Sequence, residues 1–184
     1  IDDEALLKVL DEVEKLNQNT PITFYEITTV AAFMAFARIP ADLLILETGL
    51  GGRLDATNVI ENPLASIITP IERDHEHFLG SELTQIAGEK AGIIKKNVPV
   101  ISASQTNEVG ETLKNKAREM NAPIFFEGAD FIWEQIITGE VKLECKNRVF
   151  TLPTPSLIGP HQIQNAALAA ASVIYSNNFT PMDD

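Results

Sequence analysis

The sequence has few of the features that mark secreted, membrane-bound or disulfide-bonded proteins. It contains one cysteine, Cys145, so no disulfide can form within the chain, and a reducing compartment fits this usage. No apolar run approaches the roughly 20 residues that a membrane-spanning helix needs. No basic segment followed by an apolar one marks a signal peptide. We therefore expect a cytoplasmic protein that has no membrane partner.

Positive charge is also scarce, with 14 Lys and Arg residues against 26 Asp and Glu residues and a net charge of −12. Nucleic-acid-binding proteins neutralise phosphates with Lys and Arg, so the balance argues against such a partner. If the substrates are anionic, metal ions or other parts of the protein must supply positive charge. The chain begins at Ile1 and ends in a polar stretch, residues 177–184, so we expect a piece of a longer protein.

The pattern of apolar residues predicts an α/β fold. Short apolar runs alternate with segments of helical spacing, which implies βαβ units and a mainly parallel sheet flanked by helices. A further stretch, about 129–152, alternates in part and predicts a small antiparallel β unit at the edge of that sheet. The predicted helices are 2–16, 23–38, 82–94, 108–120 and 162–175, and the predicted parallel strands are 43–46, 65–69, 98–103 and 124–126.

The second predicted helix opens with capping-box spacing, Thr23 to Glu26. It is apolar nearly all round, so we expect it to be buried against a sheet. Its cluster of Phe33, Met34 and Phe36 accordingly predicts core packing rather than a cofactor site.

Glu47 directly follows the apolar run 43–46, which has the pattern of a strand buried on both faces. A carboxylate there is costly to desolvate unless it is paired or binds a cation, and ligands bind at the carboxyl ends of parallel strands. The alternative is a capped strand end that faces water. The glycine loop 49–52 matches no common nucleotide-binding pattern, but it would let backbone amides approach an anion or a ring. Residues 55–58 are also compatible with a simple structured turn.

Two histidines and one lysine are further candidates. His75 and His77 would face opposite ways in an extended segment, so we expect one ligand at most; a solvated surface histidine is the alternative. Lys90 lies four residues after Ile86 and three after Ala87, within the apolar stripe of the predicted helix. Desolvation there favours the neutral amine, which can act as a base or nucleophile or react with CO2. The alternative is a lysine that extends to the edge of the face.

Asn165 stands near the start of the last predicted helix, in the run His161-Gln162-Ile163-Gln164-Asn165. A helix N-terminus suits a phosphate or a polar ring. Local hydrogen bonding at the helix start is the alternative role of this side chain.

Four motifs stand out in the sequence: ETGLGGRLDATN at 47–58, Asp74-His75 followed by Phe78-Leu79-Gly80, IAGEKAGIIK at 86–95, and GPHQIQNAA at 159–167. Together they resemble the signature of folylpolyglutamate synthases and dihydrofolate synthases, which belong to the Mur ligase superfamily. The resemblance is densest over 42–104 and 155–175, and it implies an ATP-dependent amide ligase with a central ATPase-type domain. Such an enzyme adds L-glutamate to dihydropteroate or folate through an acyl phosphate, uses two Mg²⁺ ions and acts as a monomer.

The same resemblance implies roles for single residues. Glu47 and His75 would bind Mg²⁺, and Lys90 would be carbamylated, so that its carbamate positions the second Mg²⁺. His75 and Lys90 would thus carry the catalytic roles, and Asn165 would contact ATP. The substrate pocket would include Arg53, Asp55, Ala56 and Asn58.

The resemblance also predicts how the chain is organised. The family's phosphate loop and C-terminal domain would lie outside these 184 residues, so we expect 1–176 to be most of a central domain that is inactive alone. Residues 177–184 would lead to the C-terminal domain. Glu72 and Arg73 depart from the family pattern and affect the expected loop conformation. Another Mur-type amino-acid ligase is an alternative that the 49–58 run disfavours, and a non-catalytic nucleotide-binding module is a second alternative.

Overall fold

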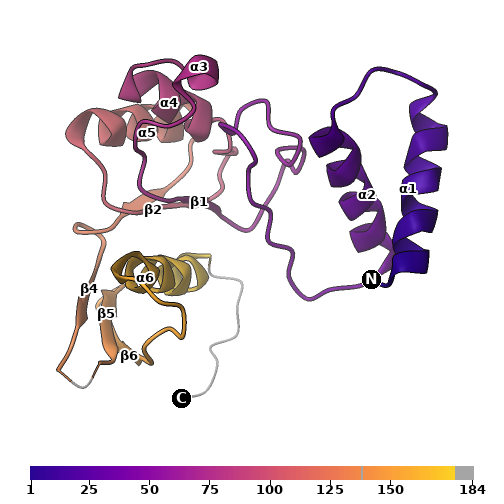
Figure 1. The fold of residues 1–184 in the computed structure, drawn as a ribbon. Helices are drawn as coiled ribbons and strands as arrows, with labels where there is room; N and C mark the ends of the chain where they lie inside the picture. The colour runs from indigo at the N-terminus through magenta and orange to yellow at the C-terminus, as the bar shows by residue number, and fades with distance from the viewer. Residues whose placement is uncertain (138, 177–184) are drawn as a thin grey trace. The chain divides into compact units, whose positions relative to one another are not determined.

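The computed structural model describes residues 1–137 and 139–176, and the chain forms two compact units, 1–59 and 60–184. Each unit is described by itself, and Figure 1 gives the order of their elements. None of the helices in the described part of the chain is long and apolar enough to cross a membrane. Predictions for the 177–184 tail, and for Thr138 in the turn of the antiparallel unit, lie outside the described residues.

The first unit contains a pair of helices, α1 (Asp3–Asn17) and α2 (Phe24–Arg38), at the indigo end of Figure 1. The predicted capping box is present. The Thr23 hydroxyl accepts the Glu26 N–H at 3.1 Å, and the Glu26 carboxylate accepts the Thr23 N–H at 2.9 Å. Val9 and Val13 of α1 pack against Ala31 of α2, so local capping and a small core together define this pair.

Two predictions for the first unit are wrong. Residues 43–46 form no strand, and Ile45 is 82% exposed. The apolar helix α2 is not buried against a sheet: Ala31 is its one buried residue, and Phe24 is 84% exposed. The reason is the same in both cases. A strand buried on both faces needs neighbouring strands and covering helices, and residues 1–59, all of them described, contain no strand.

The second unit contains the predicted parallel sheet. Its strands are β1 (Ser66–Ile68), β2 (Val100–Ser102) and β3 (Ile124–Phe126), in the order β1-β2-β3 with β2 in the centre. Helices α4 (Leu83–Ala91) and α5 (Asn107–Glu119) cover one face and α6 (Pro160–Tyr175) lies on the other (Figure 1). A short helix, α3 (Glu76–Leu79), precedes α4. The mainly parallel α/β fold is thus confirmed.

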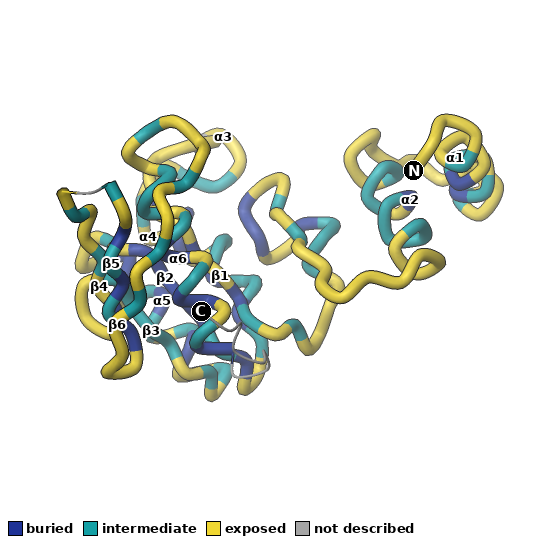
Figure 2. Tube along the Cα trace, turned by 90° about the horizontal axis from the view of Figure 1, so that it is seen from below, coloured by how far each residue is buried: buried dark blue, intermediate teal, exposed yellow. Residues whose placement is uncertain are grey.

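The core of this unit has two layers, one on each face of the sheet, and buried residues gather around β2 (Figure 2). On the α4/α5 face, Ile86 and Leu113 pack against Val100 with no exposed surface. On the α6 face, Ile101 packs with Ala167 and Ala171. Strand β2 therefore contributes successive residues to opposite layers, as a central strand does.

The antiparallel β unit also forms, from β4 (Phe131–Gln135), β5 (Val141–Cys145) and β6 (Arg148–Leu152). It is a separate three-stranded sheet, not an extension of the parallel one, and a single bridge from Glu127 to Phe131 joins the two regions. The predicted segment 141–152 is a hairpin that turns at Lys146 and Asn147, which have φ angles of 50° and 59°. Side chains that alternate along β4 and β5 pack on the α6 layer, which gives this sheet its own core face.

Candidate functional site

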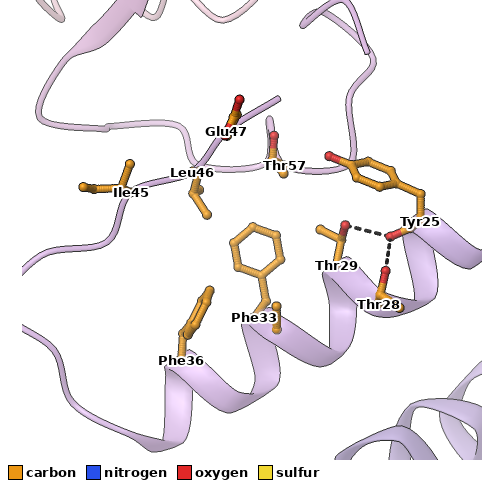
Figure 3. Close-up of a pocket in the computed structure, with 10 residues that line it drawn as sticks. Tyr25, Thr28, Thr29, Phe33, Phe36, Ile45, Leu46, Glu47 and Thr57 are labelled. Carbon is orange, nitrogen blue, oxygen red and sulfur yellow. Dashed lines mark hydrogen bonds between the residues drawn. The ribbon is translucent and has the colours of Figure 1, made fainter. Parts of the chain in front are cut away.

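A pocket of about 260 Å³ in the first unit lies between α2 and the segment 45–57. Figure 3 shows the rings of Phe33 and Phe36 extending from α2 toward Leu46 and Ile45, with Thr28 and Thr29 one turn away on the helix. Aromatic rings and hydroxyl groups therefore face one hollow. The lining residues are Tyr25, Thr28, Thr29, Ala32, Phe33, Phe36, Ile45, Leu46, Glu47 and Thr57.

The expectation that Phe33 and Phe36 are core residues is wrong, because both line this open pocket and Phe36 is 49% exposed. Met34, by contrast, packs against the α1/α2 core as expected. The sequence carries a signal for the pocket that we did not use. Two rows at spacing four, 25-29-33 and 28-32-36, place its α2 lining on one helical face.

Asp55 is the anchor of the glycine loop. One carboxylate oxygen, Oδ2, accepts the backbone N–H groups of Gly49 and Leu50, both at 2.9 Å. The other, Oδ1, accepts the N–H and hydroxyl of Thr57 at 2.9 and 2.6 Å and the Tyr25 hydroxyl at 3.2 Å. Both oxygens of this buried side chain are therefore engaged within the protein, and the loop is held to α2 through Tyr25.

These contacts shift two pKa values. Burial raises the pKa of Asp55, but the hydrogen bonds from Thr57, Leu50 and Gly49 outweigh burial and hold it below its usual value. Burial, followed by the neighbouring Asp55 charge, raises the pKa of the Tyr25 hydroxyl. At neutral pH the pair is thus an ionised carboxylate that accepts a hydrogen bond from a neutral phenol.

Close packing explains the glycine at position 49. A Cβ built on Gly49 would lie 2.4 Å from the Tyr25 ring, closer than side chains ever approach. The loop backbone therefore passes directly against the aromatic ring that Asp55 holds in place. A side chain at this position would displace Tyr25 from the pocket wall.

The other residues predicted for the substrate pocket lie beside it. Arg53 is exposed, and its backbone carbonyl accepts a hydrogen bond from the Asn58 side chain at 3.2 Å. Ala56 and Asn58 are half-buried. Of the run 53–58, only Thr57 is among the residues that line the hollow, so the loop contributes mainly through the anchoring of Asp55.

Glu47 is exposed and belongs to the pocket lining, where it extends from an irregular segment rather than from a strand end. Figure 3 shows its carboxylate pointing away from the rings of α2. Across the part of the chain that the structure describes, no group of three His, Cys, Asp or Glu residues is arranged to hold a metal ion. Mg²⁺ commonly needs only one or two protein carboxylates and completes its shell with water and phosphate, so the donor chemistry of Glu47 fits it.

His75 lies in the second unit, immediately before α3. Its backbone has a φ of 51°, and its ring Nε2 lies 3.5 Å from the Asp74 carboxylate. The side chain is 54% exposed. The segment is not extended, because His77 already belongs to α3, where the Phe78 and Leu79 N–H groups donate to the His75 carbonyl.

Lys90 lies in the last turn of α4, on the stripe that the sequence predicts. The neighbouring stripe residues Ile86, Ala87 and Ala91 are at most 1% exposed, whereas Lys90 itself is half-buried. Its stem is therefore fixed by a rigid helix while part of the side chain stays in contact with solvent. The helix ends at Ala91, three residues earlier than expected.

Asn165 is exposed on the second turn of α6, where its amide donates to Gln162 at 3.5 Å. The helix follows Gly159, whose φ of 128° is open to glycine alone. A Cβ at Gly159 would also lie 2.6 Å from the His161 ring. The tight turn therefore sets where the first residues of α6 lie.

Comparisons with known proteins agree on one family. The Mur ligase middle domain matches residues 4–173. The chain is 40% identical over 174 residues to the dihydrofolate synthase/folylpolyglutamate synthase of Bacillus subtilis. This alignment covers 88% of the chain and 39% of that protein. Mycobacterium tuberculosis folylpolyglutamate synthase complexed with ADP superposes with a TM-score of 0.85 at 34% identity, over 98% of this chain and 44% of that one.

A further solved structure, described as an FPGS–AMPPCP–folate complex, has a TM-score of 0.83 at 27% identity and covers 94% of this chain and 44% of its own. The chain thus spans about two-fifths of the length of the relatives that it matches.

Proposed function

Because the chain belongs to the Mur ligase middle domain family, we propose that it is the central part of an ATP-dependent ligase. The reaction joins L-glutamate to dihydropteroate or folate. The substrate carboxylate attacks the γ-phosphorus of ATP and ADP leaves; the glutamate amine then attacks the acyl phosphate, and phosphate leaves. The observation that carries the proposal is the pocket of the first unit, where an aromatic and hydroxyl-lined hollow lies beside the Glu47 carboxylate.

The pocket suits a flat heteroaromatic ring such as a pterin. Phe33 and Tyr25 offer ring faces for stacking. The hydroxyls of Thr28 and Thr29 donate to helix carbonyls and keep lone pairs with which to accept ring N–H groups. Asp55 contributes by fixing the loop, since five donors already engage its oxygens. Arg53, Ala56 and Asn58 remain the proposed contacts of the substrate beyond the ring.

Glu47 and His75 are the proposed protein ligands of Mg²⁺. A bound Mg²⁺ would neutralise phosphate charge, which this acidic chain cannot do alone. The Lys90 amine, fixed on α4 and partly open to solvent, can attack CO2; a C–N bond forms and a proton is released to water. The product is a carbamate anion on a rigid helix, able to position a second Mg²⁺.

The proposed ATP contact is Asn165, on the exposed side of α6. Its amide can both donate and accept, which suits an adenine edge or a ribose hydroxyl. We further propose that the full enzyme acts as a monomer in the cytoplasm and that these 184 residues alone do not catalyse ligation.

The test is ADP release by the longer protein that carries this chain. We expect release to need L-glutamate together with dihydropteroate or folate, and Glu47→Ala to abolish it. Turnover with a UDP-muramyl substrate would instead assign another Mur-type ligase. Nucleotide binding without turnover on any of these substrates would leave a binding module and refute the proposal.

A further inference from the structure

Glu127 has a set of contacts that the proposed reaction does not explain. It follows β3 directly, and its Oε1 accepts the indole N–H of Trp133 at 2.6 Å. Its Oε2 accepts the backbone N–H of Ser104 and the side-chain amide of Gln164, both at 2.8 Å. One half-buried carboxylate therefore joins the segment after β2, strand β4 and helix α6.

These partners come from distant parts of the sequence, 23 residues before Glu127 and 37 after it. Gln105 makes a similar cross-link at the same edge of the sheet. Its side chain donates to the Thr69 carbonyl at 2.9 Å and accepts the Ile71 N–H at 3.0 Å. The ends of β1, β2 and β3 are thus cross-linked by side chains. In open parallel sheets, this carboxyl edge is where ligands bind.

The link to α6 has a consequence for Asn165, the residue next to Gln164. Helix α6 begins at Pro160, and its N-cap, Gly159, has no side chain to fix the helix start. Gln164 is held by the charged Glu127, and a hydrogen bond to a carboxylate is about twice as strong as one between neutral groups. Core packing and the Gly159 turn place α6, and the Glu127–Gln164 bond adds a fixed point one residue away from Asn165.

We propose that Glu127 is a positioning residue for the nucleotide subsite: its carboxylate locks the start of α6 to the carboxyl edge of the parallel sheet and so orients Asn165. This rests on the proposed role of Asn165. Glu127 acts through Gln164 and does not itself touch the nucleotide.

The test measures steady-state KM values for ATP, L-glutamate and the folate substrate in the full-length ligase. We expect Glu127→Ala to raise the KM for ATP about tenfold, which is close to the loss of one hydrogen bond to a charged group, and to change the other two KM values less than about twofold. The matched control is Glu134→Gln, an exposed carboxylate on β4 that pairs with Lys142; we expect all three KM values to stay unchanged.

A rescue separates orientation from general stability. Glu127→Gln gives the site an amide N–H₂ that opposes one of the three donors, so we expect the KM for ATP to rise. Adding Trp133→Phe removes the opposed indole N–H, and the double variant should recover most of the lost affinity. Equal increases in all three KM values, or no rescue, would overturn the inference. If Asn165→Ala leaves the KM for ATP unchanged, the proposed nucleotide contact itself fails; if Asn165→Ala raises it and Glu127→Ala does not, the positioning role alone fails.

Discussion

The anchoring of the glycine loop by Asp55 leads to a quantitative prediction for Asp55→Asn. The substitution keeps the shape of the side chain but removes its charge and replaces one oxygen with N–H₂. Placed at Oδ1, the amide can still donate to the Thr57 and Tyr25 hydroxyls, which can rotate, but it opposes the Thr57 backbone N–H. The two backbone bonds from Gly49 and Leu50 then go to a neutral acceptor.

The expected cost follows from these three backbone bonds. A hydrogen bond to a charged group stabilises by about 1.5–3 kcal/mol and one to a neutral group by about 1 kcal/mol, so weakening two bonds costs about 1 kcal/mol each. Opposing the Thr57 N–H costs about 1 kcal/mol more. The sum, about 3 kcal/mol, corresponds to an approximately 100-fold larger opening constant for the loop.

Amide hydrogen exchange of the loop in the full-length protein is the direct assay, because it reports local opening residue by residue. We expect the amides of Gly49, Leu50 and Thr57 to exchange about 100-fold faster in Asp55→Asn, while amides of α5 keep their wild-type rates. Tyr25→Phe is the milder comparison, since it removes only one hydrogen bond to the Asp55 carboxylate, at 3.2 Å, and should accelerate exchange about tenfold. Wild-type exchange in the loop of Asp55→Asn would refute the anchoring role.

Three further outcomes follow from the same geometry. Gly49→Ala places a Cβ against the Tyr25 ring and should raise the KM for the folate substrate about tenfold. The control is Gly110→Ala, whose Cβ meets no atom within 4 Å and which should leave this KM unchanged. Equal KM values in the two variants would contradict the packing argument. Because the folded pKa of Asp55 is lowered, its stabilisation of the loop is complete above the unfolded value of about 4 and is lost as the pH falls through the folded value. Loop protection factors measured at stepped pH should therefore fall only in strong acid, and a loss already near pH 6 would exclude Asp55 as the cause. Full-length ligase equilibrated with ¹³C-bicarbonate and Mg²⁺ should give a carbamate ¹³C signal that Lys90→Arg removes, and a signal that persists in the variant would assign the carbamate elsewhere.

The elements that sequence reasoning predicted well are those whose cause is local. The Thr23–Glu26 capping box is one example, because both partners lie within four residues. The stripe on α4 is another: the positions that flank Lys90 on it are fully buried, as the 3–4 spacing indicates. The parallel pairing of the strands is a third example, because the alternation of strands and helices along the chain predicts βαβ units.

The failures concern burial that depends on distant partners. Residues 43–46 have the composition of a buried strand, yet a strand exists only where another strand supplies hydrogen bonds, and residues 1–59 contain none. Phe33 and Phe36 are of the residue type that fills protein cores, but a pocket lies between them and the segment 45–57. In the same way, the family resemblance implied that Asp55 is a pocket residue, but it did not reveal the hydrogen bond that the Tyr25 hydroxyl, 30 residues away, donates to Asp55.

Three carboxylates, those of Asp55, Glu127 and Glu47, differ in what occupies their oxygens. Five donors surround Asp55 and three surround Glu127. A cation would have to displace N–H groups from either of them, and each displaced buried donor costs about 1–3 kcal/mol. Glu47 is exposed at the pocket lining and carries no such cost. On the proposed role of Glu47 as a Mg²⁺ ligand, we therefore expect Glu47→Gln, unlike Asp55→Asn, to raise the Mg²⁺ concentration that ADP release requires.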